Sequence, residues 1–270
     1  GGGQTGGGQG RNAFKSRLAT ANVPRWPLAS DGIPSAGADG ARRDQRSADS
    51  QRGGDAFWED DDEQVQNNGV QILLVRHGQS TWNAQGRWQG QADMPLSSLG
   101  VAQSALAAIR LAGGNPTIHG EDLGIRNITA VYSSNMQRAV QTASILAQQA
   151  ELGPVIEDER LRERSVGEWS GLTYEEVQRK WPGYLKRRLL PPSYETDDHV
   201  LPRVFAALEN VRKMQPGGRV VVVCHAGVIY AVEAYLKAKA RRRNPQRRYR
   251  IGNLGTRWII WDGKGFRLGK

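Results

Sequence analysis

Apolar residues are sparse along the first 68 positions of the chain and dense from Val70 onward. The first ten residues, GGGQTGGGQG, are glycine and polar residues only, and residues 11–68 continue with little periodicity. A segment of this composition buries too little apolar surface to offset the entropy lost when a chain is ordered. We therefore predict a disordered or extended N-terminal tail, of low complexity, over residues 1–68 and a folded domain over residues 69–270. Trp26, Phe57 and Trp58 are exceptions within the tail, and are candidates for docking it onto the domain or onto a partner.

From Val70 the sequence alternates between short apolar runs, typical of buried strands, and longer segments with helical spacing. The predicted strands are 70–75, 128–134, 155–158 and 219–225, and the predicted helices are 97–112, 136–152, 173–181, 199–214 and 226–240. Ser97 or Ser98 is the expected N-cap of the first long helix. The last residues, 255–269, are typical of a hairpin with Asp262-Gly263 at its turn.

Strands that alternate with helices predict an α/β domain, here a three-layer sandwich with a mostly parallel central sheet and helices on both faces. The four consecutive valines at 220–223 favour a parallel strand that is covered on both sides. In such sheets the functional loops lie beyond the carboxyl ends of the strands. Arg76-His77-Gly78, Ser133-Ser134 and His225 each follow a predicted strand, so we expect them at one edge of the sheet.

Five segments of the domain together resemble a known family. They are LVRHGQSTWN (74–83), GRWQGQADMPLSSLG (86–100), VYSSNMQRAVQTA (131–143), LRERSVGEWSGLT (161–173) and VVVVCHAGVI (220–229). In this order they resemble the signature segments of the histidine phosphatase superfamily, the phosphoglycerate mutase-like proteins. The resemblance covers nearly all of residues 70–270 and leaves out the tail.

The resemblance implies a role for each matching residue. His77 would be the nucleophile and would carry a phosphohistidine, and Glu163 would be the proton donor. Three cationic or polar side chains would bind the phosphoryl oxygens: Arg76, Arg138 and His225. Asn83 and Gln89 stand where the family places further contacts to the phosphate or the substrate. The family needs no metal and no other cofactor, and the single cysteine and the absence of zinc-ligand spacing agree with this expectation.

The same residues suit phosphoryl transfer on physical grounds. A neutral imidazole avoids the repulsion that an anionic nucleophile meets at a phosphate ester, and two nearby arginines should lower the pKa of His77 and keep it neutral. The planar fork of arginine matches phosphate oxygens bidentately. A carboxyl group beside a bound phosphate is more easily protonated because of like-charge repulsion, so Glu163 suits the role of acid.

Several alternatives stay open at this point. Glu168, five residues after Glu163, is a competing acid. Cys224 could act as a nucleophile with His225, but adjacent strand residues face opposite sides, so we expect Cys224 to point into the packing. His119 and His199 lie outside every motif and are expected at the surface.

The sequence favours a phosphomonoester hydrolase, a histidine acid phosphatase type of enzyme, over a phosphoglycerate mutase. Mutases that resemble this chain carry extra segments after the arginine helix, whereas Glu163 follows Arg138 by only 25 residues. One departure leaves the substrate open: PPSYETDD (191–198) stands where many phosphatase members have Gly-Gly-Glu-Ser, with Glu195 as the candidate equivalent. The mutase remains the alternative, and the substrate is expected to be a small phosphorylated molecule.

The charge of the chain points to anionic partners. The formal net charge is +10 and the isoelectric point about 10.0. The segment KAKARRRNPQRRYR (237–250) has eight basic residues and no acid, so RNA or an acidic protein surface is a candidate partner there. The alternative function is a binding subunit of a larger assembly that uses the phosphatase fold. Part of it also suits a helix C-terminus, where cations complement the dipole.

Three features of the sequence bear on the cellular compartment of the protein: its apolar runs, its cysteine content and the charge of its tail. No apolar run approaches the length of a membrane span, so we expect no membrane partner. A single cysteine suits an intracellular, reducing compartment. The tail up to Ser30 is basic without an acid, as in an organellar targeting region of a mitochondrion or plastid, but acidic residues from Asp31 onward argue against that reading and leave the cytoplasm open.

Overall fold

The computed structural model describes residues 69–111, 127–240 and 251–269. The predicted tail, His119 and most of the basic segment therefore lie outside the described residues. A six-stranded sheet forms the centre of the domain, in the order β3-β2-β4-β1-β5-β6. Its strands are β1 (Gln71–Arg76), β2 (Ile128–Ser133), β3 (Ile156–Glu157), β4 (Arg219–Cys224), β5 (Thr256–Trp261) and β6 (Phe266–Leu268).

The sheet is parallel from β3 to β1 and antiparallel at its other edge. β1 and β2 both pair with β4 in parallel, β3 pairs with β2 in parallel, and β5 and β6 add the antiparallel hairpin. The hairpin was predicted, and its loop carries Gly263 at φ 87°, a conformation that glycine adopts without strain. The mixed α/β fold with a mostly parallel sheet is thus confirmed.

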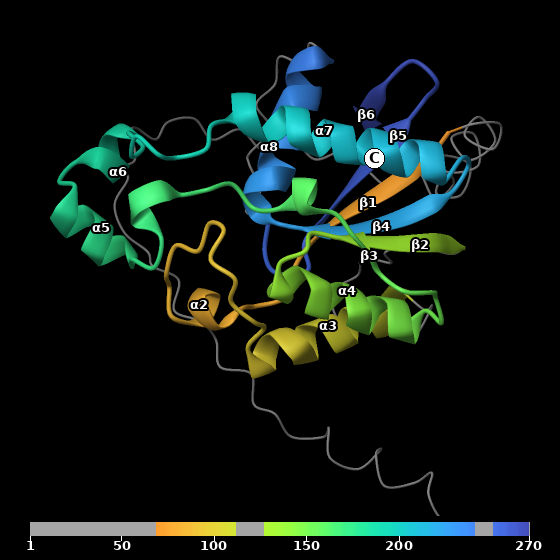
Figure 1. The fold of residues 1–270 in the computed structure, drawn as a ribbon, viewed down its shortest axis with the longest axis horizontal. Coiled ribbons are helices and arrows are strands. Elements are labelled where there is room, and N and C mark those ends of the chain that lie inside the picture. The colour runs from red at the N-terminus through yellow and green to blue at the C-terminus, as the bar shows by residue number, and fades with distance from the viewer. Residues whose placement is uncertain (1–68, 112–126, 241–250, 270) are drawn as a thin grey trace, which may run out of the picture. The chain divides into compact units, whose positions relative to one another are not determined.

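Seven α-helices occur within the described residues, and four of them cover the sheet. The helices are α2 (Thr81–Ala84), α3 (Ser98–Leu111), α4 (Gln137–Gln149), α5 (Tyr174–Lys180), α6 (Tyr184–Arg187), α7 (Asp197–Met214) and α8 (Ala226–Lys239). In Figure 1, α3 and α4 lie on one side of the sheet and α7 and α8 on the other. No helix among the described residues is long and apolar enough to cross a membrane.

The valine strand β4 explains the two covered faces. Val220 and Val222 belong to the core cluster that includes α7 and α8, whereas Val221 and Val223 belong to the cluster that includes α3 and α4. Alternate side chains of one strand therefore bury into two different layers. A third, smaller cluster centres on Trp169, packed 5.2 Å from Trp88 between ring centroids, and it anchors the segment that contains α5 and α6.

The helix boundaries differ from the prediction by a few residues, and two short helices were not predicted. Ser97 is the cap of α3, because its Oγ accepts the amide of Gly100 at 3.1 Å. α7 begins two residues earlier than predicted, at Asp197, where two acids occupy its first turn. α2 and α6 have only four residues each, too short to produce an apolar period.

Two glycines bring the loop after β1 against α3. A Cβ at Gly78 would lie 2.6 Å from the carbonyl oxygen of Gly100, and one at Gly100 would overlap the backbone of Gln79. Position 78 therefore needs glycine because of its packing against α3.

Candidate active site

The two histidines predicted for the site come together at the carboxyl ends of neighbouring strands. β1 and β4 run parallel with Arg76 opposite Cys224, and the amide of His77 donates to the carbonyl of Cys224 at 3.1 Å. His77 and His225 therefore follow the two strand ends side by side, with ring centroids 5.2 Å apart. Both are buried. The sheet thus brings two histidines that are 148 positions apart in the sequence into contact.

The hydrogen bonding of His77 fixes which ring nitrogen can react. Nδ1 lies 2.6 Å from the carbonyl oxygen of Gly78. A carbonyl can only accept, so Nδ1 carries the proton and the Nε2 lone pair is left unprotonated. Burial, followed by the positive charges of Arg138 and Arg76, lowers the pKa of His77 well below its ordinary value, although the bond to Gly78 opposes this shift. The ring is therefore neutral at neutral pH.

Arg138 enters the site from the second residue of α4 and is 1% exposed. Its Nη1 donates to the carbonyl of Ala92 at 2.7 Å and its Nη2 to that of Gly90 at 2.8 Å. Its Nε is buried without a hydrogen-bond partner among the described residues. Burial lowers the pKa of Arg138 to about 10, against the opposing charges of Glu163 and Asp93. The Arg138 side chain is thus a cation in a fixed position, and its hydrogen bonds also hold the loop of residues 90–92 in place.

Arg76, a cation, and His225, a buried imidazole, complete the group of side chains around His77. Nη1 of Arg76 donates to the carbonyl of Ile251 at 2.8 Å. Nε2 of His225 lies 2.9 Å from Oγ of Ser134, while its Nδ1 is buried with no partner among the residues that the structure describes. Burial and then the charge of Arg138 lower the pKa of His225 well below its ordinary value. A buried Nδ1 with no protein partner is suited to a bound oxygen.

Glu163 lies over the start of α8, next to His225. Its Oε2 accepts the amide of Gly227 at 3.1 Å and its Oε1 accepts the amide of Arg164 at 2.9 Å. A Cβ at position 227 would collide with the Glu163 carboxylate, so only glycine leaves room for it there. Its negative charge acts on Arg138 and on Cys224, which places the carboxylate within electrostatic reach of α4 and of the end of β4.

The competing residues lie elsewhere. Glu168 is exposed and accepts a hydrogen bond from Ser193 at 2.6 Å. Cys224 belongs to the core cluster under α7 and α8, and burial raises the pKa of its thiol, so it is not an available nucleophile. His199 is exposed, as predicted. Among the described residues, no group of three or more His, Cys, Asp and Glu side chains is arranged to hold a metal ion.

Asn83, in α2, and Gln89, in the loop after α2, lie close to the segment that begins at His77. Oδ1 of Asn83 is 3.4 Å from Nδ2 of Asn253, which also donates to the carbonyl of His77 at 3.0 Å. Gln89 is 8% exposed, and its Oε1 accepts from Ser80 at 2.7 Å. Both predicted residues are therefore close to the nucleophile loop, each held by a neighbour. Their contact to a substrate stays a prediction.

Glu195, the candidate equivalent of the missing Gly-Gly-Glu-Ser motif, belongs to a network around Arg203. The guanidinium of Arg203 donates to both carboxylate oxygens of Glu195, at 2.8 and 3.0 Å. It also donates to three carbonyls of the segment that carries the acid: Arg160, Arg162 and Glu163. Burial by itself would raise the pKa of Glu195, but the bonds from Arg203 and from the amide of Ser165 hold it below its ordinary value. Glu195 is thus a partner of Arg203.

Sequence reasoning missed Arg203, Thr142 and Asn253 as supports of the site. Thr142 Oγ1 accepts the amide of Gly78 at 3.0 Å, which positions the loop after His77. Ser134 was expected at this edge of the sheet because it follows a predicted strand, and its Oγ lies 2.9 Å from Nε2 of His225. Asn253 contacts His77 from 176 residues away, and no local pattern marks it.

Comparisons with known proteins agree with this geometry. Residues 72–270 match the sequence-family model of the histidine phosphatase superfamily (branch 1). A metal-independent phosphoserine phosphatase from Arabidopsis thaliana is 35% identical over 179 residues, covering 64% of this chain and 71% of the relative. A probable phosphoglycerate mutase from Escherichia coli is 33% identical over 208 residues, which covers 73% of this chain and 90% of the relative. The structure of a mycobacterial glucosyl-3-phosphoglycerate phosphatase superposes with a TM-score of 0.59 at 28% identity, and the alignment covers 74% of this chain and 97% of that one.

Proposed function

The chain belongs to the histidine phosphatase superfamily, and on this premise we propose that it hydrolyses small phosphomonoesters through a phosphohistidine on His77, without a metal. The observation that carries the proposal is the state of the His77 ring. Its Nδ1 proton is committed to the Gly78 carbonyl, its Nε2 lone pair is free, and it lies among Arg76, Arg138 and His225. A neutral nucleophile in a cationic pocket is the combination that a phosphate dianion needs.

The first step transfers the phosphoryl group to the enzyme. The Nε2 lone pair of His77 forms a bond to phosphorus, and the bond between phosphorus and the ester oxygen breaks with its electron pair leaving on that oxygen. Glu163, in its acid form, gives its proton to this oxygen and releases the alcohol. Arg76, Arg138 and His225 stabilise the charge on the three remaining oxygens. The result is phosphohistidine and a Glu163 carboxylate.

The second step returns the enzyme to its starting state. Glu163 takes a proton from a water molecule whose oxygen bonds to phosphorus, and the phosphorus–nitrogen bond breaks with its electrons returning to Nε2. Inorganic phosphate leaves, and Glu163 is again protonated. Splitting one difficult substitution into two easier ones is the gain of covalent catalysis.

Phosphoserine is the first substrate to test, because two of the relatives carry that activity in their names. Phosphate release from a panel of phosphomonoesters, in the presence of EDTA, should be abolished by His77→Ala and lowered about 10²–10⁴-fold by Glu163→Gln. His199→Ala and Glu168→Gln are the matched controls, since each changes the same residue type at an exposed position. Full activity of His77→Ala, or equal losses in Glu163→Gln and Glu168→Gln, would refute the assignment.

A mutase is the second candidate, supported by the name of the Escherichia coli relative. A mutase retains the displaced alcohol and rephosphorylates it. Incubation with 3-phosphoglycerate distinguishes the two: formation of 2-phosphoglycerate without stoichiometric phosphate release indicates the mutase, and release of phosphate indicates the hydrolase.

A further inference from the structure

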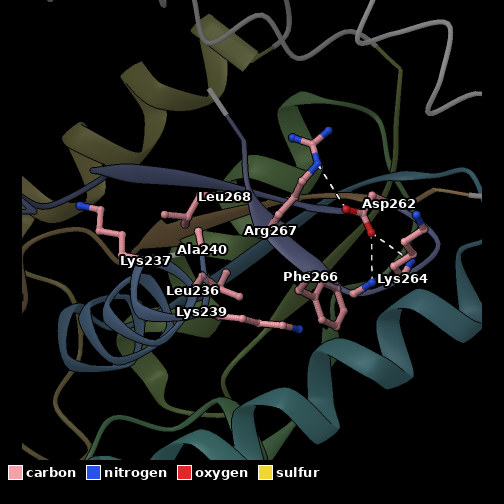
Figure 2. A pocket seen from close by; sticks show the side chains of 10 residues that line it. Leu236, Lys237, Lys239, Ala240, Asp262, Lys264, Phe266, Arg267 and Leu268 are labelled. Carbon is pink, nitrogen blue, oxygen red and sulfur yellow. Dashed lines mark hydrogen bonds and ion pairs between the residues drawn. The ribbon is translucent and has the colours of Figure 1, made fainter. Parts of the chain in front are cut away.

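A pocket of about 380 Å³ lies at the end of the domain opposite to His77. It opens between the last turn of α8 and the β5–β6 hairpin (Figure 2). The hairpin loop starts at Asp262, directly after Trp261, whose amide donates to the carbonyl of Val70 at the beginning of β1. His77 follows the other end of β1. The pocket is therefore separated from the catalytic residues by the full length of a strand.

The pocket combines an apolar floor with several basic side chains. Leu236, Phe266 and Leu268 provide the apolar surface. Lys237 is paired with Glu233 at 2.6 Å, and Arg267 lies 3.8 Å from Asp262. Lys239 and Lys264 have no carboxylate partner among the residues that the structure describes, and Figure 2 shows the ammonium group of Lys239 directed toward Phe266. A ligand that fits has acidic groups beside aromatic or aliphatic ones.

The N-terminal part of this chain contains a segment of that chemistry. Residues 57–63 read FWEDDDE, two aromatic residues followed by five acids. Glu63 precedes Val70 by seven residues, a span of up to about 25 Å when extended. Val70 is hydrogen-bonded to Trp261, next to the pocket wall, so the tether reaches the pocket easily.

We propose that residues Phe57–Glu63 of this chain occupy the pocket between α8 and the β5–β6 hairpin. The acids pair with Lys239 and Lys264, and the aromatic side chains cover the apolar floor. A short tether gives such a segment a millimolar effective concentration, so modest contacts suffice for occupancy. The proposal is independent of the catalytic assignment, because none of its residues belongs to the site around His77.

Cross-linking in the full-length chain tests the proposal. The single native cysteine, Cys224, is buried, so engineered thiols are the reactive ones. Asp61→Cys is combined with Gly265→Cys, whose Cβ would face the flexible end of Lys239 at 3.1 Å. The control pairs Asp61→Cys with Gly153→Cys, an exposed position with open space around it, close to β3 at the opposite edge of the sheet. Disulfide formation in oxidised glutathione is followed by mass spectrometry.

If the tail docks in the pocket, the disulfide between positions 61 and 265 should form at least about tenfold faster than the disulfide between positions 61 and 153. Lys239→Glu with Lys264→Glu, or about 1 M NaCl, should lower the rate to that of the control. Replacing the remaining acids of 59–63 by amides on the Gly265 background should have the same effect and leaves the folded domain unchanged. Equal rates of formation for these two disulfides would overturn the proposal. So would fast formation of the 61–265 disulfide in the variant whose tail acids have been replaced by amides.

Discussion

Arg203 should be the residue outside the reacting groups whose loss harms this enzyme most. It lies on α7 and donates to the carboxylate of Glu195 and to three backbone carbonyls of residues 160–163. The side chains of Arg203 and Glu195 are only 21% and 15% exposed. Arg203→Ala leaves a largely buried carboxylate without its partner and several carbonyls without a donor. Breaking one side of a buried ion pair costs about 3–5 kcal/mol, and partial exposure favours the lower value, about 3 kcal/mol.

The pH dependence distinguishes this network from simple loss of packing. The folded-state pKa of Glu195 lies below its ordinary value of 4.5. A lowered carboxyl pKa contributes stability that is present above pH 4.5 and is lost as the pH falls through the folded-state value. The difference in unfolding free energy between the wild type and Arg203→Ala should therefore be full at pH 7 and smaller below pH 4.5, as the Glu195 contribution disappears from the wild type.

Urea unfolding at pH 7 and near pH 4 measures both effects, with kcat as the functional readout. Because Arg203 holds the backbone of Glu163, kcat should fall while KM changes little. Arg267→Ala is the control, since its contact to Asp262 is 3.8 Å long and both side chains are about 40% exposed, so it should cost less than about 1 kcal/mol. A cost for Arg203→Ala no larger than that of Arg267→Ala at pH 7 would refute the reasoning.

Three further outcomes follow from the geometry. Gly227→Ala should reduce kcat about 10²-fold with little loss of stability, because its Cβ meets the flexible end of Glu163; thermal unfolding and steady-state kinetics check both. Gly100→Ala should lower the free energy of unfolding, measured with urea, by about 3 kcal/mol, because the added Cβ meets the Gln79 backbone. Gly153→Ala, where the Cβ points into open space, should leave that free energy within about 0.5 kcal/mol of the wild type. The lowered pKa of His77 means that the unfolded chain binds a proton that the folded chain does not, so the unfolding free energy falls below pH 6.5. His77→Asn should flatten that slope by up to about 1.4 kcal/mol per pH unit, as measured by urea unfolding at several pH values.

The sequence predicted those parts of the molecule that depend on periodic burial or on the ends of parallel strands. The valine run of β4 and the apolar run of β1 were sufficient to place His77 and His225 at the same edge of the sheet, because parallel strands end at the same edge. That β1 and β4 are neighbours, which brings the two rings together, is seen only in the structure. The short α2 was not predictable from periodicity, since its four residues are stabilised by the Ser80–Asn83 capping box. Asn253 and Arg203 act through backbone carbonyls far away in sequence, and such contacts depend on the tertiary structure alone.

The closing contacts of the site come from the last part of the chain. The carbonyl of Gly255 accepts the amide of Arg76, the amide of Leu254 donates to the Arg76 carbonyl, and Asn253 holds the carbonyl of His77. A growing polypeptide that has emerged only as far as α8 has both histidines but lacks these contacts. We expect the site around His77 to be completed only after residues 253–255 have been synthesised, so a truncation before Asn253 should yield a chain with an incomplete loop after His77, whatever its secondary structure.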